Sequence, residues 1–163
     1  MKVKRKLEKI VSILSDNSKT VSTMESCTGG AVVNALTNVP GASRVLNFSA
    51  VTYCNEYKIK MGVDKNIIDK YSVYSKETAR DMARAISLFA LSDYGIGITG
   101  KLGKRDLDNM CGDDNQVFIA IYDKEKDKYV DFDVFVDRDD RRDDKLEVLE
   151  IIVDKFLSYL ENE

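Results

Sequence analysis

The sequence predicts an α/β fold in which a mixed sheet carries helices on both faces, a three-layer α/β/α sandwich. Helical and strand patterns alternate early in the chain, while two adjacent strands follow later. Both ends of the chain have apolar residues at helical spacing. The 163 residues can bury one core, and no repeat or linker divides them, so we expect a single domain over 1–163.

The elements follow from local patterns. β-branched and aromatic runs predict strands at residues 20–24, 45–53, 94–99, 116–122 and 129–136. Apolar periodicity and capping signals predict helices at residues 2–16, from near Thr28, 56–61, 65–70, 75–91 and over a C-terminal stripe from 146 to 160. Gly95 and Gly97 interrupt one strand, which indicates that other atoms approach its backbone closely.

Composition narrows the class of protein. The net charge of −3 has interspersed signs and gives no basic stripe for nucleic acid. No apolar run reaches the ~20 residues of a membrane helix, and the N-terminus lacks the apolar segment of a signal peptide. The three cysteines are odd in number and widely spaced, which favours reduced thiols and a cytoplasmic location. We therefore expect no nucleic-acid partner and no membrane association.

The chain contains no histidine, and this limits its chemistry. Mechanisms that use a Ser-His or Cys-His pair are excluded, as are metal sites that contain histidine. Any general base must be a lysine, an aspartate, a glutamate, a tyrosine or a thiolate.

The run ESCTGG at residues 25–30 lies where a strand is expected to turn into a helix. The first amides of a helix are unpaired and carry the positive end of its dipole, so they suit a phosphate or an oxyanion. Ser26 lies in the turn, where a nucleophile would be exposed. A purely structural interpretation stays open, in which Ser26 and Thr28 cap the helix and the glycines allow tight packing.

Further segments occur in a recognisable order. They are VPGAS at 39–43, VTYCNEYK at 51–58, SKETA at 75–79, ITG at 98–100 and DRDDRR at 137–142. Together with ESCTGG, they make the chain similar to the C-terminal domain of the CinA family from about residue 5 onward. The family resemblance implies the same α/β fold.

The resemblance also implies an activity. Proteins with this domain are nicotinamide-nucleotide amidases, which hydrolyse nicotinamide mononucleotide to nicotinate mononucleotide and ammonia without a metal or cofactor. Carried over by motif, Ser26 is the nucleophile, Lys58 its base, and Tyr53 orients the lysine or shares its protons. The residues implied to contact the substrate are Thr28, Gly29, Gly30, Ser43, Asn55, Thr99, Gly100 and Arg142. The partner is then a small nucleotide, and a homodimer stays open because relatives are often dimeric.

Structural interpretations of these residues stay open beside the functional ones. Lys58 alone would be a solvated surface charge, and Tyr53 a strand-end residue with its hydroxyl at the rim. Arg142 stands among aspartates and would pair with them. Cys27 is expected to be a buried, unreactive thiol.

The segment after Gly100 departs from the family. A glycine- and proline-rich loop is replaced at 101–115 by KLGKRDLDNMCGDDN, and Cys54 replaces a serine. In one hypothesis, Lys101, Lys104 and Arg105 supply by side-chain charge what the family supplies by backbone amides, so the reaction is kept. In the other, the pocket is filled and the domain is a catalytically degenerate nucleotide-binding or interaction module.

Overall fold

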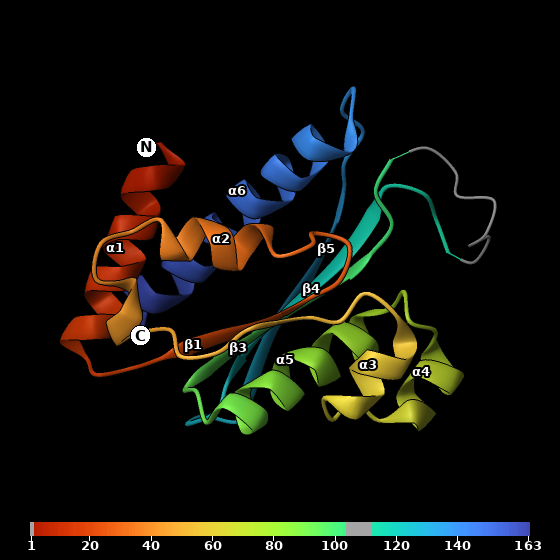
Figure 1. Ribbon diagram of the computed structural model, residues 1–163, viewed down its shortest axis with the longest axis horizontal. Coiled ribbons are helices and arrows are strands. Elements are labelled where there is room, and N and C mark those ends of the chain that lie inside the picture. The colour runs from red at the N-terminus through yellow and green to blue at the C-terminus, as the bar shows by residue number, and fades with distance from the viewer. Residues whose placement is uncertain (1, 104–111) are drawn as a thin grey trace.

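The computed structural model describes residues 2–103 and 112–163, which build a five-stranded sheet between helices (Figure 1). The strands are β1 Val21–Glu25, β2 Ala50–Val51, β3 Tyr94–Gly100, β4 Gln116–Asp123 and β5 Lys128–Phe135. They stand in the order β2-β1-β3-β4-β5. β1 is parallel to β2 and β3, whereas β4 is antiparallel to β3 and β5. The sheet is therefore mixed, as predicted.

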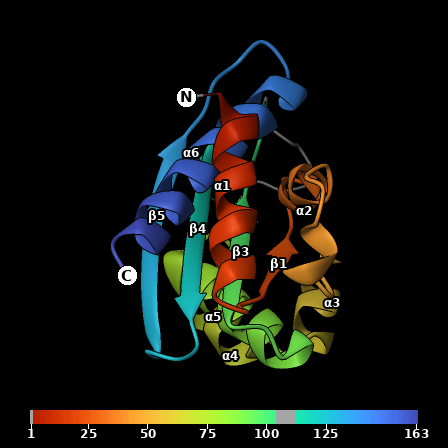
Figure 2. The ribbon, with the colours of Figure 1, turned by 90° about the vertical axis from the view of Figure 1, so that its left-hand side faces the viewer.

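Helices cover both faces of this sheet (Figure 1, Figure 2). One layer consists of α1 Val3–Asp16, α2 Ala31–Thr37 and α6 Arg141–Glu161. The other consists of α3 Asn55–Lys60, α4 Lys65–Tyr71 and α5 Lys76–Ala90. A short 3₁₀ helix, η1 Ala42–Arg44, lies between α2 and β2. The predicted three-layer sandwich is confirmed.

Successive side chains of a strand point to opposite faces of the sheet, so the sheet separates two hydrophobic cores, one on each face. In β4, Val117 and Ile119 join the large core with α1 and α6, whereas Ala120 packs with Ala79 and Ala83 of α5 on the opposite face. A strand buried on both faces has apolar residues in both alternating sets, as β4 does.

Two of the three glycines of β3, Gly95 and Gly97, allow α5 to pack closely on the sheet. A Cβ at Gly95 would lie 1.9 Å from the Ala83 carbonyl oxygen, and one at Gly97 would lie 2.2 Å from that of Ala79. The close approach that the sequence predicts is therefore confirmed, and the approaching atoms belong to the backbone of α5.

Two predicted elements were wrong in their bounds. The strand expected over 45–53 is reduced to Ala50–Val51, because the amides of Val45 and Leu46 both bond to the Ala42 carbonyl and close the turn of η1. The helix expected to begin near Thr28 begins at Ala31. Between β1 and this helix lies a turn over 26–30 that carries Ser26 and Cys27 of the candidate site.

Candidate active site

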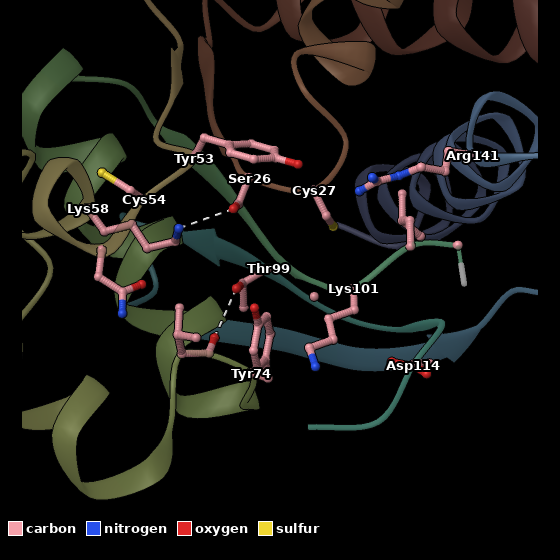
Figure 3. Close-up of a pocket in the computed structure, with 15 residues that line it drawn as sticks. Ser26, Cys27, Tyr53, Cys54, Lys58, Tyr74, Thr99, Lys101, Asp114 and Arg141 are labelled. Carbon is pink, nitrogen blue, oxygen red and sulfur yellow. Dashed lines mark hydrogen bonds between the residues drawn. The ribbon is translucent and has the colours of Figure 1, made fainter. Parts of the chain in front are cut away.

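A cavity of about 330 Å³ opens at the carboxyl ends of β1, β2 and β3 (Figure 3). Ligands of open α/β sheets commonly bind at this edge, where the loops that follow the strands diverge. The cavity is lined by six residues that the motifs predict, namely Ser26, Tyr53, Asn55, Lys58, Thr99 and Gly100. They come from the turn after β1, the segment from β2 into α3, and the end of β3.

Ser26 and Lys58 meet on one wall of this cavity (Figure 3). Lys58 Nζ donates hydrogen bonds to Ser26 Oγ at 3.1 Å and to the Thr52 carbonyl oxygen at 2.7 Å. Lys58 is 1% exposed. The structure therefore excludes the interpretation of Lys58 as a solvated surface charge.

Burial also changes the acidity of Lys58. Within residues 2–103 and 112–163, no carboxylate forms an ion pair with the Lys58 amine, whose hydrogen-bond partners are a hydroxyl and a carbonyl. Desolvation disfavours the ammonium form and lowers the pKa of Lys58 from 10.5 to about 8. A useful fraction of neutral amine is then present near neutral pH, and a neutral amine can accept the hydroxyl proton of Ser26.

The turn after β1 is held by the side chain of Glu25. Its carboxylate accepts hydrogen bonds from the amides of Val32 and Val33, at 3.0 and 2.9 Å, in the first turn of α2. At these two amides, the helix end that the sequence expects to suit an anion is occupied by the carboxylate of Glu25. The same carboxylate, rather than Ser26 or Thr28, caps the helix.

Backbone amides nevertheless remain available in the turn. The Gly29 amide donates to the Ser26 carbonyl at 2.9 Å, so it is engaged. In the described part of the chain, the Thr28 amide donates to no protein acceptor, and the Cys27 amide contacts only the thiol of its own residue. They directly follow the Ser26 nucleophile position, where donors to an oxyanion are useful.

The thiol of Cys27 and the ring of Tyr53 also lie near Ser26. Burial raises the pKa of the Cys27 thiol to about 12, which fits the predicted unreactive thiol. Tyr53 is 65% exposed and lies above Ser26 at the mouth (Figure 3). Among the described residues its hydroxyl has no hydrogen-bond partner, so the structure gives no contact through which it would orient Lys58.

Comparison with known proteins shows which family the chain belongs to. A sequence model of the CinA C-terminal domain matches residues 4–156. The chain belongs to the CinA C-terminal domain family. Two curated relatives are named competence-damage inducible proteins. That of Clostridium perfringens strain SM101 is 48% identical over 99 residues, which are 60% of this chain and 24% of that protein. That of Caldanaerobacter subterraneus is 43% identical over 97 residues, 59% of this chain and 24% of that protein.

These matches span about a quarter of the length of the curated CinA relatives. Solved CinA structures share the fold over nearly the whole chain. A competence or damage-inducible protein of Enterobacter asburiae superposes with a TM-score of 0.89 at 23% identity, covering 98% of this chain and 99% of that one. A corresponding protein of Agrobacterium tumefaciens gives 0.86 at 23% identity, with coverage of 98% and 95%.

Some residues of the CinA motifs lie outside the cavity lining. These are Thr28, Gly29, Gly30, Ser43 and Arg142. Ser43 is exposed in η1, near Val45, whose carbonyl accepts from the amide at the opposite, amino end of β1. Arg142 is exposed on α6, and the lining residue is its neighbour Arg141.

Three lining residues of this CinA domain, Tyr74, Asp114 and Arg141, were missed from the sequence. Tyr74 lines the wall below Thr99 together with Lys101, whose Nζ lies 5.2 Å from the centre of the Tyr74 ring (Figure 3). Asp114 and Arg141 line the far side. The only sign of them in the sequence is their position beside motif residues: Tyr74 precedes the SKETA segment and Arg141 precedes Arg142. Their joint placement depends on loops whose course the sequence does not specify.

The charged loop is only partly described. Lys104, Arg105 and Cys111 lie outside the described residues. Lys101 lies inside them and does line the cavity, so one of the three proposed charges is in place. Across 2–103 and 112–163, no group of three or more Cys, Asp or Glu side chains is arranged to hold a metal. In the same residues, no helix is both long and apolar enough to cross a membrane.

Proposed function

We propose that this CinA-family domain is an amidase that converts nicotinamide mononucleotide to nicotinate mononucleotide and ammonia. The observation that carries the proposal is the buried contact of 3.1 Å between Lys58 Nζ and Ser26 Oγ beside an open cavity. The family resemblance supplies the substrate. The names of the curated relatives speak of competence and damage and leave the reaction open.

In the first half of the reaction, neutral Lys58 accepts the proton of the Ser26 hydroxyl while Oγ bonds to the carboxamide carbon. The carbonyl oxygen becomes an oxyanion, for which the amides of Cys27 and Thr28 are the nearest backbone donors in sequence. Lys58, now an ammonium, gives its proton to the leaving nitrogen. The C–N bond breaks, ammonia departs, and an ester on Ser26 remains.

In the second half, water attacks the ester carbon and Lys58 accepts a proton from that water. Collapse of the second tetrahedral intermediate breaks the bond to Oγ. Lys58 returns the proton to Ser26, and the acid product gives its remaining proton to solvent and leaves as the nicotinate carboxylate. The Thr52 carbonyl stays bonded to Nζ at 2.7 Å and holds the amine in reach of Oγ in both halves.

The cavity also has features that suit a nucleotide. Lys101 and Arg141 add positive charge away from Lys58, and Asp114 is the only carboxylate among the described lining residues. Arginine binds phosphate through two parallel hydrogen bonds, so Arg141 is the natural phosphate partner. Tyr53 lies above Ser26 at the mouth, where it would contact the pyridine ring (Figure 3).

Ammonia release from nicotinamide mononucleotide tests the proposal. The wild-type protein is expected to release ammonia, and a Ser26→Ala variant is expected to lose the activity. Equal ammonia release from both proteins would refute the proposal. If nucleotides raised the melting temperature without turnover, the non-catalytic binding module would replace it.

A further inference from the structure

Glu25 is the one residue of the ESCTGG motif whose side chain is fully buried, charged and outside the proposed chemistry. Four groups donate to its carboxylate. Oε1 accepts from Thr28 Oγ1 at 2.7 Å and from the Val32 amide at 3.0 Å. Oε2 accepts from the Val33 amide at 2.9 Å and from Thr23 Oγ1 at 3.1 Å.

These bonds enclose Ser26 on both sides in sequence. Thr23 lies in β1 before it, Thr28 lies in the turn after it, and the two amides belong to α2. The Glu25 carboxylate therefore forms hydrogen bonds with β1, with the turn over 26–30 and with α2 at the same time. A turn that is fixed at both ends leaves the Ser26 side chain few alternative positions.

The main chain of Glu25 reaches the base as well. Its carbonyl oxygen accepts the Thr52 amide at 2.9 Å. The Thr52 carbonyl, in turn, accepts Lys58 Nζ at 2.7 Å. Glu25 thus also positions Thr52, whose carbonyl orients the amine of Lys58.

We propose that Glu25 is a positioning residue that holds Ser26 in line with Lys58. The inference rests on the proposed function for its catalytic meaning, but it concerns the reactivity of Ser26 whatever the substrate. A carboxylate is required because only it offers four acceptor sites on two oxygens. In Glu25→Gln, whichever way the amide is turned, its NH₂ group meets the N–H of Val32 or Val33.

The reaction of Ser26 with a sulfonyl fluoride measures this positioning without the natural substrate. Oγ forms a bond to sulfur, the S–F bond breaks, fluoride leaves, and Lys58 accepts the hydroxyl proton. The rate is followed by mass spectrometry of the Ser26 peptide. We expect Glu25→Gln to react at least about 10-fold more slowly than the wild type, since small displacements of reacting groups have large effects.

A helix cap elsewhere provides the structural control. Asp64 caps α4 by accepting the Asn66 amide at 2.8 Å, and it lies outside the cavity lining. Asp64→Ala is expected to lower the melting temperature and leave the sulfonylation rate within about 2-fold of the wild type. Thr23→Val removes one donor to Glu25 with little change of shape, and it is expected to slow sulfonylation even if Glu25→Gln does not fold.

The pattern of rates decides the inference. Wild-type rates in folded Glu25→Gln, or in Thr23→Val should Glu25→Gln not fold, would overturn it. So would a wild-type Ser26 that reacts no faster than in Lys58→Met, because no aligned pair would then exist to be held. In parallel, kcat for nicotinamide mononucleotide should fall in Glu25→Gln with little change in KM. Sulfonylation that depends on Glu25 without ammonia release would keep the inference and refute the proposed function.

Discussion

Lys58 Nζ lies 3.1 Å from Ser26 Oγ, although 32 residues separate the two in sequence. Lys60, two residues further along α3, has a different environment. It is exposed and pairs with Glu56 at 2.6 Å. The same short helix therefore carries one lysine as a surface charge and one as a buried partner of a hydroxyl, which allows the two to be compared directly.

Replacing the buried lysine should lower activity strongly without unfolding the domain. We expect Lys58→Met to lower kcat by a factor of about 10² to 10⁴, the usual contribution of a general base. The melting temperature should change little, because methionine fills similar space and removes the cost of burying an amine. Ammonia release and thermal unfolding by circular dichroism measure the two effects. Lys60→Met is the control and should retain wild-type activity, since exposed ion pairs contribute little.

Activity should rise with pH in the alkaline direction. Burial lowers the Lys58 pKa to about 8, and only the neutral amine accepts the Ser26 proton. We therefore expect kcat/KM to increase through a pH of about 8 and to level off above it. Initial rates between pH 6 and pH 10 would locate the midpoint at about 8. Rates that keep rising up to pH 10 without levelling off, as for a lysine with the unperturbed pKa of 10.5, would contradict the role of burial.

Neighbouring arginines on α6 should behave differently toward the substrate. Arg141 lines the cavity and Arg142 does not. We expect Arg141→Ala to raise KM for nicotinamide mononucleotide by a factor of about 10 to 100, through loss of a charged hydrogen bond to phosphate. Arg142→Ala should change KM by less than about 2-fold. If steady-state kinetics showed a larger rise in KM for Arg142→Ala than for Arg141→Ala, Arg142 and not Arg141 would be the phosphate-binding residue.

The packing of α5 on β3 can be tested by adding one methyl group. A Cβ at Gly97 would lie 2.2 Å from the Ala79 carbonyl oxygen and 2.5 Å from the Ala83 amide nitrogen. Because both atoms belong to backbone, Gly97→Ala should lower the free energy of unfolding by about 3 kcal/mol or more. Gly41→Ala is the comparison, since its Cβ meets nothing within 4 Å at a φ of +89°. Strain alone should cost it about 1 kcal/mol in urea unfolding. Equal losses would contradict the packing argument.

Local patterns predicted the layers well, because apolar periodicity records which face of an element is buried. β4 and the glycines of β3 are examples. The strand expected over 45–53 failed because β-favouring residues there are recruited into the turn of η1, where Val45 bonds to Ala42. The β-propensity of Val45 is a property of its side chain alone. The turn that follows Pro40 determines that the amide of Val45 bonds to the Ala42 carbonyl and not to a neighbouring strand.

The candidate site was predictable in part. Motif order singled out Ser26 and Lys58, which lie in hydrogen-bond contact. The burial of Lys58 was not predictable, since the polar helix NEYKIK gives no sign of which side chain the sheet covers. Arg141 and Arg142 differ by one step around α6, and helix starts cannot be placed within one residue from sequence. Two of the four bonds to Glu25, those from the amides of Val32 and Val33, depend on the true start of α2 at Ala31.

In the proposed reaction, Ser26 attacks the carboxamide with Lys58 as its base. Rapid quenching of the protein during turnover of nicotinamide mononucleotide, followed by mass spectrometry of its peptides, detects the covalent intermediate. We expect an acyl ester on the Ser26 peptide that is absent in Lys58→Met. Ammonia release with no adduct on Ser26, together with full activity of Ser26→Ala, would contradict the proposed reaction.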